Sequence, residues 1–200
     1  MNKDILKAEF IGIMLGDGYL NIKNNELKIS LDKIKEVEYS KQVIKLINNI
    51  FDIKVKAYPR KCDGTLDIRS RNRKLIKEVS ELGLKQSPKM CNAIIPKNFM
   101  NKKYYPHLVR GYFDTDGCIT ATNNNGIRYP RVEMKICNSP MQKQYTKILK
   151  ELGINFGAYK IDNNAIRVQA NGFKELKKWM KIIGSRNKKN IDKAITFLKY

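Results

Sequence analysis

The sequence predicts an α+β protein made of two pseudo-symmetric αββαββα repeats, each an antiparallel sheet covered on one face by helices. The first observation is a motif at residues 10–20, FIGIMLGDGYL, which recurs at residues 109–119 as VRGYFDTDGCI. The second is that the motif acids lie 99 positions apart (116 − 17 = 99), an offset that also aligns two pairs of glycines. The third is that similar strand and helix patterns follow each copy, which indicates an internal duplication joined through its two motif helices.

The first motif predicts a helix with one nearly flat face. Gly12 and Gly16 lie four residues apart and therefore share a face of that helix. A glycine inside a helix costs about 1 kcal/mol relative to alanine, so two of them suggest that another backbone approaches closely. Gly111 and Thr115 occupy the matching positions of the second copy and are also small. We therefore expect these four residues to form the interface between the two helices.

Packing these helices side by side would bring Asp17 and Asp116 together at their C-terminal ends. The negative ends of both helix dipoles and the neighbouring carboxylate would then disfavour ionisation of each acid. A divalent cation would relieve both problems. The alternative is two core helices that each end in a solvated Asp-Gly turn, which a single copy of the motif would favour. The duplication at matching places in two halves favours a shared site instead.

The rest of the first half alternates between strand and helix patterns. Alternation of apolar and polar residues predicts strands, and apolar residues three and four apart predict helices. Asn24-Asn25 and Asp63-Gly64 suit hairpin turns, and Gly83 suits a helix end. In order, the sequence predicts a helix at 3–16, strands at 18–23 and 26–31, a helix at about 34–49, strands at 53–60 and 65–71, and a helix at 72–82 capped by Ser70 or Asn72.

The second half repeats this order. We expect a first domain at residues 1–100, with a connecting segment from about residue 85, and a second domain at 101–200 with an extra terminal helix. No Gly/Ser-rich linker separates them, so the halves should pack together. The second half is predicted to contain a helix at about 104–116, strands at 118–122 and 128–136, a helix at 141–152, strands at 156–161 and 165–170, and helices at 172–183 and 190–200.

Positive charge is spread over the whole chain. The 200 residues include 40 Lys and Arg against 19 Asp and Glu, a formal net charge of +21, and each half carries 20 of the cations. A folded, aromatic-containing chain with this charge predicts a polyanionic partner, usually nucleic acid. An anionic membrane surface is the rival, but we find no apolar run of about 18 residues and no signal-peptide segment. We expect an intracellular protein, in the cytoplasm of a prokaryote or in an organelle, that is neither secreted nor membrane-bound.

The inventory of metal-binding residues argues against the common zinc sites. Cys62, Cys91, Cys118 and Cys137 form no CxxC pair, and His107 is the only histidine. A zinc finger or a histidine-based nuclease site is hard to build from these residues. We expect reduced cysteines and a structural histidine.

The predicted strands have a polar, basic face opposite their apolar face. Along residues 53–60, lysine, tyrosine and arginine alternate with isoleucine, valine and alanine. A merely solvated sheet would carry more carboxylates and fewer arginines, so we favour contact with phosphates and bases. The residues predicted to contact DNA are Tyr19, Asn21, Lys23, Lys28, Ser30, Lys54, Lys56, Tyr58, Arg60, Arg69, Arg71, Thr120, Thr122, Arg128, Arg131, Lys135, Lys160, Arg167 and Gln169.

The duplicated motif resembles the paired motifs of the LAGLIDADG homing endonucleases in their single-chain, two-repeat form. The match is FIGIMLGDG at residues 10–18 and VRGYFDTDG at residues 109–117, and the repeats cover nearly the whole chain. The resemblance implies a site-specific, intron-encoded enzyme that cleaves both strands of a long, asymmetric double-stranded DNA target. It also implies a monomer that needs no protein partner.

The resemblance also implies a metal-dependent hydrolysis. Phosphodiester hydrolysis is served well by metal ions held by carboxylates, and we expect Asp17 and Asp116 to be the catalytic metal ligands. Mg²⁺ suits them because it keeps several waters and needs few protein ligands, while Mn²⁺ or Ca²⁺ can substitute for binding. In the family the backbone carbonyl before each acid also holds metal, which here falls on Gly16 and Thr115.

A basic or amide residue usually stands just after the second strand of each repeat in this family. That region makes Lys33 and Asn138 candidate catalytic residues. Asp32 and Ser139 depart from the family pattern, and Lys33 fits an ordinary surface lysine equally well.

Two other functions are compatible with the same fold: an RNA-binding splicing maturase and a non-catalytic DNA-binding regulator. Loss of a motif acid would favour either one, whereas the presence of both acids favours an active nuclease. An intein-embedded enzyme is not expected, because the sequence begins at Met1 and ends in FLKY without a His-Asn terminus. The residues alone, without the resemblance, predict a basic, duplicated nucleic-acid-binding protein with an acidic candidate metal site.

Overall fold

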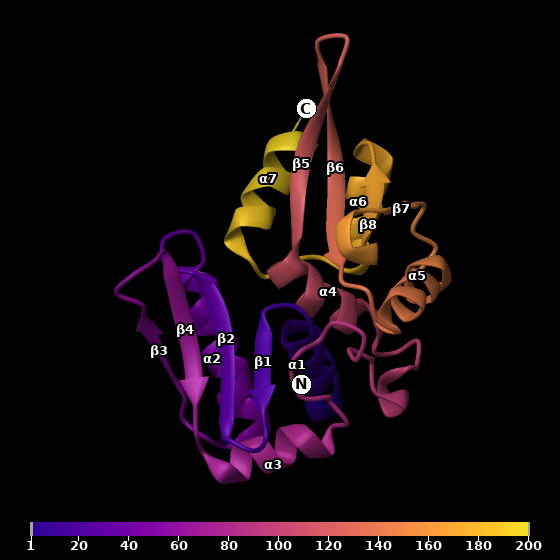
Figure 1. Cartoon of the computed structure of the whole chain (residues 1–200). Helices are drawn as coiled ribbons and strands as arrows, with labels where there is room; N and C mark the ends of the chain where they lie inside the picture. Colours follow the sequence, from indigo (N-terminus) through magenta and orange to yellow (C-terminus); the bar gives the residue numbers. More distant parts are fainter. Residues whose placement is uncertain (1, 200) are drawn as a thin grey trace.

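The computed structural model describes residues 2–199 and shows two four-stranded sheets on either side of a central helix pair, α1 and α4 (Figure 1). The first repeat consists of α1 (Lys3–Leu15), β1 (Gly18–Asn21), β2 (Glu26–Asp32), α2 (Val37–Phe51), β3 (Lys56–Pro59), β4 (Thr65–Ser70) and α3 (Arg73–Glu81). The second consists of α4 (Tyr105–Asp116), β5 (Gly117–Asn124), β6 (Ile127–Ile136), α5 (Met141–Glu151), β7 (Gly157–Lys160), β8 (Ile166–Asn171) and α6 (Phe173–Ile182), and is followed by α7 (Lys188–Leu198).

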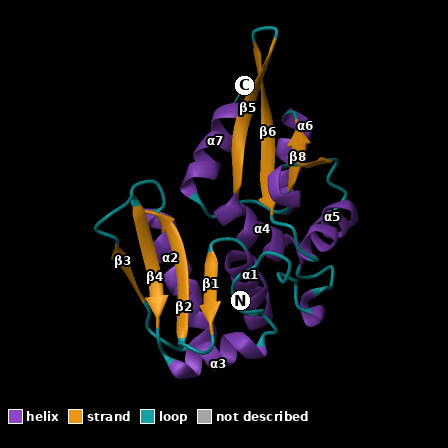
Figure 2. Cartoon of the chain, viewed as in Figure 1, coloured by secondary structure: helices purple, strands orange, loops and turns teal. Residues whose placement is uncertain are grey.

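The two sheets have the same topology. Their strand orders are β1-β2-β4-β3 and β5-β6-β8-β7, and every neighbouring pair is antiparallel. Figure 2 shows α2 behind the strands of the first sheet and α6 behind those of the second. This arrangement confirms the predicted α+β fold with two αββαββα repeats.

Burial follows the strand alternation predicted from the sequence. In β2, Leu27, Ile29 and Leu31 are buried, while the residues between them are half-buried on the other face. Each sheet therefore has one apolar face under helices and one polar face that remains accessible. No helix within residues 2–199 is long and apolar enough to cross a membrane, and the four cysteines are free thiols.

The two largest boundary differences from the sequence prediction lie at the starts of the second helix and of the strand predicted at 53–60. The second helix begins at Val37 rather than near residue 34, because the Asp32 carboxylate accepts hydrogen bonds from the backbone N–H groups of Ile34 and Lys35. These bonds stabilise a turn in place of the first helical turn, and Ile34 is 79% exposed. The strand predicted at 53–60 is shortened to Lys56–Pro59.

The helix pair α1–α4 is the main contact between the repeats. A Cβ atom added at Gly12 would overlap the carbonyl oxygen of Leu108, and one added at Gly111 would overlap that of Glu9. The same addition at Gly16 would overlap the Thr115 hydroxyl. The two backbones therefore approach more closely than side chains would allow.

The substitution Gly111→Ala tests this close approach. Its methyl group would overlap the Glu9 carbonyl oxygen and lie 3.0 Å from the Ile13 nitrogen, so the helices would have to separate. We expect the free energy of unfolding to fall by about 2 kcal/mol, because overpacking outweighs the helix propensity gained with alanine. Urea denaturation measures the change.

Gly64→Ala is the matched control, since nothing lies within 4 Å of a Cβ placed at this exposed turn. Its stability should stay within about 0.5 kcal/mol of the parent. A Gly111→Ala protein as stable as this control would contradict the packing described for the helix pair.

Candidate functional site

The two motif carboxylates lie at the adjoining C-terminal ends of α1 and α4. Asp17 follows Gly16, the C-cap of α1, and Asp116 is the last residue of α4. A Cβ atom at Gly16 would lie 3.2 Å from Oδ2 of Asp116, so the end of α1 abuts that carboxylate. Asp17 is half-buried, and Asp116 keeps an exposed surface although protein atoms surround its carboxyl group. The helix pair thus brings one acid from each repeat to a single place.

Burial makes both carboxylates hard to ionise, and at Asp17 the negative charge of Asp116 adds to this effect. Burial is the largest cause that raises the pKa of Asp17 to about 7, and the negative charges of Asp116 and Glu36 contribute to the same shift. The pKa of Asp116 is also raised, chiefly by burial, although three lysines act in the opposite direction. A divalent cation would compensate this concentration of negative charge.

Three lysines surround the acids: Lys89 in the connecting segment, Lys135 at the end of β6, and Lys189 in α7. Burial lowers the pKa of Lys89, while the attraction of Asp116 and Asp17 opposes that shift. Sequence reasoning missed Lys89 and Lys189. Each follows the third helix of its repeat, and they lie 100 positions apart, close to the offset of the motif acids. The duplication therefore held a signal that could have identified them.

A cavity of about 410 Å³ opens beside Asp116, with Gly16, Lys89, Lys135 and Asn138 among its lining residues. Its lining combines two carboxylates, Asp116 and Asp162, with two ammonium groups and two amides, which suits a hydrated, metal-bound phosphate group better than an apolar ligand. Another cavity, of about 400 Å³, lies between β5, β6, α6 and α7. Apolar side chains, two threonines, Arg128 and Lys193 line it, without any acid.

The donors at the helix ends fit a hard divalent cation. Within residues 2–199 no group of three or more His, Cys, Asp or Glu side chains could hold a metal ion, so a protein-only cage is absent there. Two carboxylates with raised pKa values remain, and the carbonyls of Gly16 and Thr115 lie at helix C-termini, where carbonyls lack intrahelical partners. This set suits Mg²⁺, which needs few protein oxygens because it keeps its own waters.

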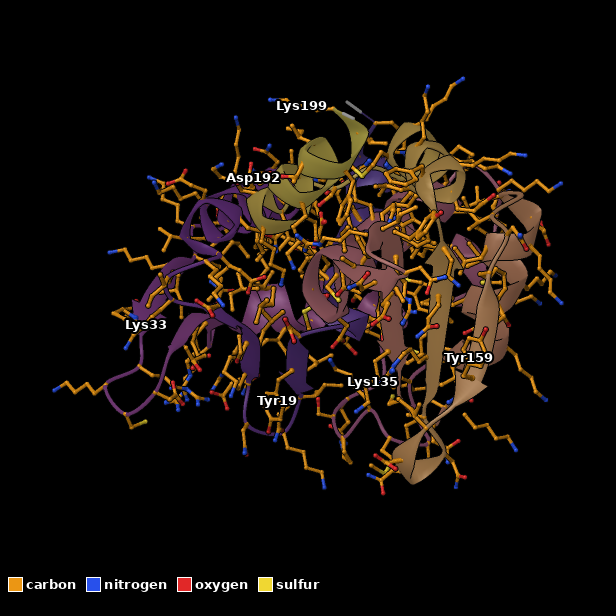
Figure 3. All side chains as sticks on the ribbon, turned by 90° about the horizontal axis from the view of Figure 1, so that it is seen from above. Tyr19, Lys33, Lys135, Tyr159, Asp192 and Lys199 are labelled. Atoms are coloured by element: carbon orange, nitrogen blue, oxygen red, sulfur yellow. The ribbon has the colours of Figure 1, made fainter. Side chains whose placement is uncertain are left out.

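The two basic or amide candidates have different locations. Asn138 lines the cavity beside Asp116. Lys33 is exposed and donates from Nζ to the carbonyl oxygen of Asp63 at 2.9 Å, so here its side chain is directed to the β3–β4 turn. Its backbone turns with Asp32 toward the β3–β4 turn, and Figure 3 shows Lys33 at the outer edge of the molecule.

The first sheet places many of the predicted DNA-contacting residues on its accessible face. Tyr19, Lys28, Arg69 and Lys56 form one row across the four strands. Lys28 lies over the Tyr19 ring, with Nζ 5.3 Å from the ring centroid. Ser30 and Tyr58 flank Asp67 in the next row, and Asn21 ends β1. Lys23, Lys54, Arg60 and Arg71 lie outside the paired strands, in the adjoining turns and loops.

The second sheet presents a corresponding surface. Arg131, Glu133 and Lys135 of β6 alternate with buried residues and pair with Thr120, Gln169 and Arg167 of the neighbouring strands. Thr122 continues this face toward the hairpin tip. In Figure 3, Tyr19 of the first sheet and Lys135 and Tyr159 of the second lie on the same side of the molecule, opposite Asp192 and Lys199.

Two predicted DNA contacts lie on the wrong face. Arg128 shares the helix-facing side of β6 with Val132 and lines the apolar cavity. Lys160 pairs with Ile166 and shares its side of the sheet with buried Val168. Tyr159, which sequence reasoning missed, takes the accessible side beside Arg167 and is 53% exposed. Successive strand residues point to opposite faces, so an assignment displaced by one residue reverses the side.

Carboxylates hold several arginines of this surface in fixed positions. Arg60 donates from Nε to Asp67 at 3.0 Å, and Arg69 forms an ion pair with Glu26. Nη1 of Arg131 lies 3.1 Å from Oε1 of Glu133, which also accepts a hydrogen bond from Gln169 at 3.1 Å. These donors are partly oriented without any ligand, which reduces the entropy cost of recognising base edges.

Comparison with known proteins identifies the fold. Residues 104–193 match the family described as LAGLIDADG-like domain, and no curated protein matches the chain by sequence. I-DmoI in complex with DNA and Ca is similar with a TM-score of 0.65 at 14% identity over 100% of both chains. I-LtrWI, a LAGLIDADG homing endonuclease bound to target DNA, gives 0.61 at 12% identity, covering 98% of this chain and 90% of that one. The N-terminal LAGLIDADG domain of DUF199/WhiA gives 0.63 at 16% identity, covering 94% and 87% respectively.

These likenesses confirm the predicted resemblance to single-chain LAGLIDADG proteins with two repeats. I-DmoI has also been solved with DNA and Mn, and one variant in the presence of Mg. At such low identity the likeness concerns the fold, and a fold alone does not establish cleavage.

The substitution Asp17→Asn tests the electrostatic cost of the site. Because the folded-state pKa of about 7 exceeds the ordinary 3.8, the folded protein binds a proton more tightly, and stability falls as pH rises between these values. An amide cannot ionise, so the variant should be the more stable protein near pH 8 in chelator and equal to the parent near pH 4. The gain should be below about 4 kcal/mol, because solvent screens a half-buried group.

Asp63→Asn is the control of opposite sign. Hydrogen bonds from Thr65 and Arg60 hold the pKa of this exposed carboxyl below its ordinary value. This variant should therefore gain nothing near pH 8. Thermal unfolding of both variants across this pH range checks the prediction, and a pH-independent effect of Asp17→Asn would contradict it.

Proposed function

Because residues 104–193 match a LAGLIDADG-like domain and the whole chain has the two-repeat LAGLIDADG fold, we propose that this protein is a site-specific DNA endonuclease. It would hydrolyse both strands of a long double-stranded target. The observation that carries the proposal is the meeting of Asp17 and Asp116, one from each repeat, between two basic sheet faces. A duplex lying along both sheets would present its two backbones to this pair.

The sheets supply the binding energy and the sequence specificity in this proposal. Lysines and arginines neutralise phosphates, so affinity should fall steeply with salt concentration. The oriented arginines, Gln169 and Asn21 can donate to base edges in the major groove. Since the two sheets carry different residues at matching positions, the preferred target should be asymmetric.

The residues around the cavity have separable roles in hydrolysis. Asp17 and Asp116, with the carbonyls of Gly16 and Thr115, would hold Mg²⁺, which supplies an activated water and polarises the scissile phosphate. Lys89 and Lys189 would stabilise the negative charge that develops on the phosphate oxygens. Asn138, which lines the same cavity, would orient a phosphate oxygen or the attacking water.

The wider biological role is part of the same proposal. An endonuclease that makes a double-strand break at one long site suits homing of the intron that encodes it. Both repeats and both acids lie in one chain, so a monomer would suffice, acting on DNA inside the cell.

A non-catalytic DNA-binding role is the second candidate, because the DUF199/WhiA domain has a similar fold. RNA binding as a splicing maturase is a further possible outcome of the experiments below. Both alternatives retain the basic surface and differ from the first proposal in lacking a requirement for the two acids.

The substitution Lys89→Met tests the role of the buried lysine. Methionine keeps the side chain's length and removes its charge, so DNA binding should change less than about threefold. The single-turnover cleavage rate should fall about 100-fold, because one preorganised cation beside the reacting phosphate is lost. Lys33→Met is the matched control and should cleave at the parent rate, since Lys33 bonds only to the β3–β4 turn among the described residues. Equal rates for both variants would contradict the role of Lys89.

Cleavage of a plasmid library of candidate sites tests the proposed function. The purified protein is incubated with Mg²⁺ beside an Asp17→Asn, Asp116→Asn double variant. We expect linear product from the parent alone, because removal of both carboxylates removes the charged metal ligands. Cleavage by the double variant would refute the site assignment. Tight binding without cleavage by the parent would favour the regulator or the maturase.

A further inference from the structure

The segment between α6 and α7 crosses the ends of the motif helices and binds residues of both repeats. The backbone N–H of Arg186 donates to Oδ2 of Asp114 at 2.8 Å, and the Ser185 hydroxyl donates to the same carboxylate. The Arg186 guanidinium forms an ion pair with Glu9 of α1, with Nε 2.6 Å from Oε1. Asp114 and Glu9 are both almost completely buried, so these bonds form inside the junction of the repeats.

Asn187 is the centre of this segment, and its side chain is completely buried. Its Nδ2 donates to Oε1 of Glu36 at 2.6 Å and to the backbone carbonyl of Asp114 at 2.8 Å. Its Oδ1 accepts a hydrogen bond from the Lys189 backbone N–H at 3.2 Å and so caps α7. One amide therefore connects the first repeat, the second motif helix and α7, with both of its donor hydrogens used.

Glu36 links this amide to the charged surroundings of the acids. It precedes α2 and is 5% exposed. Its Oε1 accepts from Asn187 and also from Lys189 Nζ, both at 2.6 Å, while Oε2 accepts from the Asp32 N–H at 2.8 Å. The position of the Lys189 ammonium group thus depends on a carboxylate that Asn187 holds in place.

We propose that Asn187 is a positioning residue for the hydrolysis: it sets the spacing of the two repeats at the acids and places Lys189 beside them. The proposal rests on the proposed endonuclease function. Asn187 acts at one end through the Asp114 carbonyl, two residues before Asp116, and at the other through Glu36 and Lys189. A shift of about 1 Å in such a constellation can cost about 100-fold in rate.

A helix cap alone would not need this arrangement. Asn72 caps α3 by accepting a hydrogen bond from the Leu75 N–H at 3.1 Å. Unlike Asn187, Asn72 is exposed, and among the described residues its side chain bonds to no distant element. Capping requires only the side-chain oxygen. Helix capping therefore does not explain the two hydrogen bonds that the Asn187 side chain donates to Glu36 and to the Asp114 carbonyl.

The substitution Asn187→Asp separates positioning from capping. Aspartate keeps the shape and the capping oxygen, loses both donors, and places a carboxylate against Glu36. We expect the single-turnover cleavage rate on prebound DNA to fall at least about 10-fold, while affinity for DNA, measured with Ca²⁺ in place of Mg²⁺, stays within about threefold. Asn72→Asp makes the same change at an ordinary cap and should leave both values unchanged.

Reversing the polarity of the Glu36–Asn187 bond provides the decisive test. Glu36→Gln alone keeps only one acceptor oxygen, so its amide donor must face either the Asn187 donor or the Asp32 N–H, and the variant should also slow cleavage. The double variant Glu36→Gln, Asn187→Asp restores a donor–acceptor pair, so its rate should exceed that of Asn187→Asp by about fivefold or more. Recovery of this kind is not expected from damage to the fold, which would accumulate. A double variant no faster than either single one, or an Asn187→Asp protein at the parent rate, would overturn the proposal.

A readout independent of cleavage keeps this test separate from the proposed function. Mg²⁺ should raise the melting temperature of the parent, and about threefold more Mg²⁺ should be needed for the same rise in Asn187→Asp, because the end of α4 is no longer held. If the parent does not cleave, the endonuclease proposal fails. The Mg²⁺ titration then decides about Asn187, and equal titrations for both proteins would overturn its positioning role.

Discussion

The close approach of the α1 and α4 backbones is the contact on which the rest of the structure depends. Gly12 and Gly111 leave room for backbone carbonyls where a methyl group would overlap them. Each glycine weakens its own helix, and that cost is offset by the contact between two backbones. The same contact brings the ends of both helices together, so that the packing of the core and the geometry of the site have one cause.

Electrostatic repulsion opposes the packing of α1 against α4 at their C-terminal ends. Two carboxylates meet where two helix dipoles have their negative ends, and a buried Glu36 lies near them. Lys89 and Lys189 offset part of this repulsion from either side, and a divalent cation would offset more. Elsewhere the net charge of +21 disfavours compactness and favours a polyanion. A cation at the two acids and a polyanion on the basic surface would each reduce the electrostatic repulsion within the chain.

The two repeats share a plan but are not equivalent. The β5–β6 hairpin is longer than β1–β2 and projects beyond its sheet (Figure 1). The connecting segment follows α3 in the first repeat, whereas α7 follows α6 in the second, and both bring a lysine to the acids. The connecting segment bonds to Asn138 and Gln144 of the second repeat, and the segment before α7 bonds through Asn187 to Glu36 of the first. The duplication thus supplies the two acids of the site, and the segments outside the repeats supply the lysines and the hydrogen bonds that hold the two repeats together there.

The sequence by itself determined the repeat, the helix interface and the place of Asp17 and Asp116, because spacing within one helix fixes which residues share a face. It also predicted the strand faces wherever alternation was uninterrupted. Only the tertiary structure decided which residues surround the acids. The family resemblance made Lys33 a candidate, but its side chain bonds to the β3–β4 turn. Lys89 comes instead from the connecting segment and Lys189 from the start of α7. Loop paths depend on hydrogen bonds to distant residues, and local patterns do not encode them.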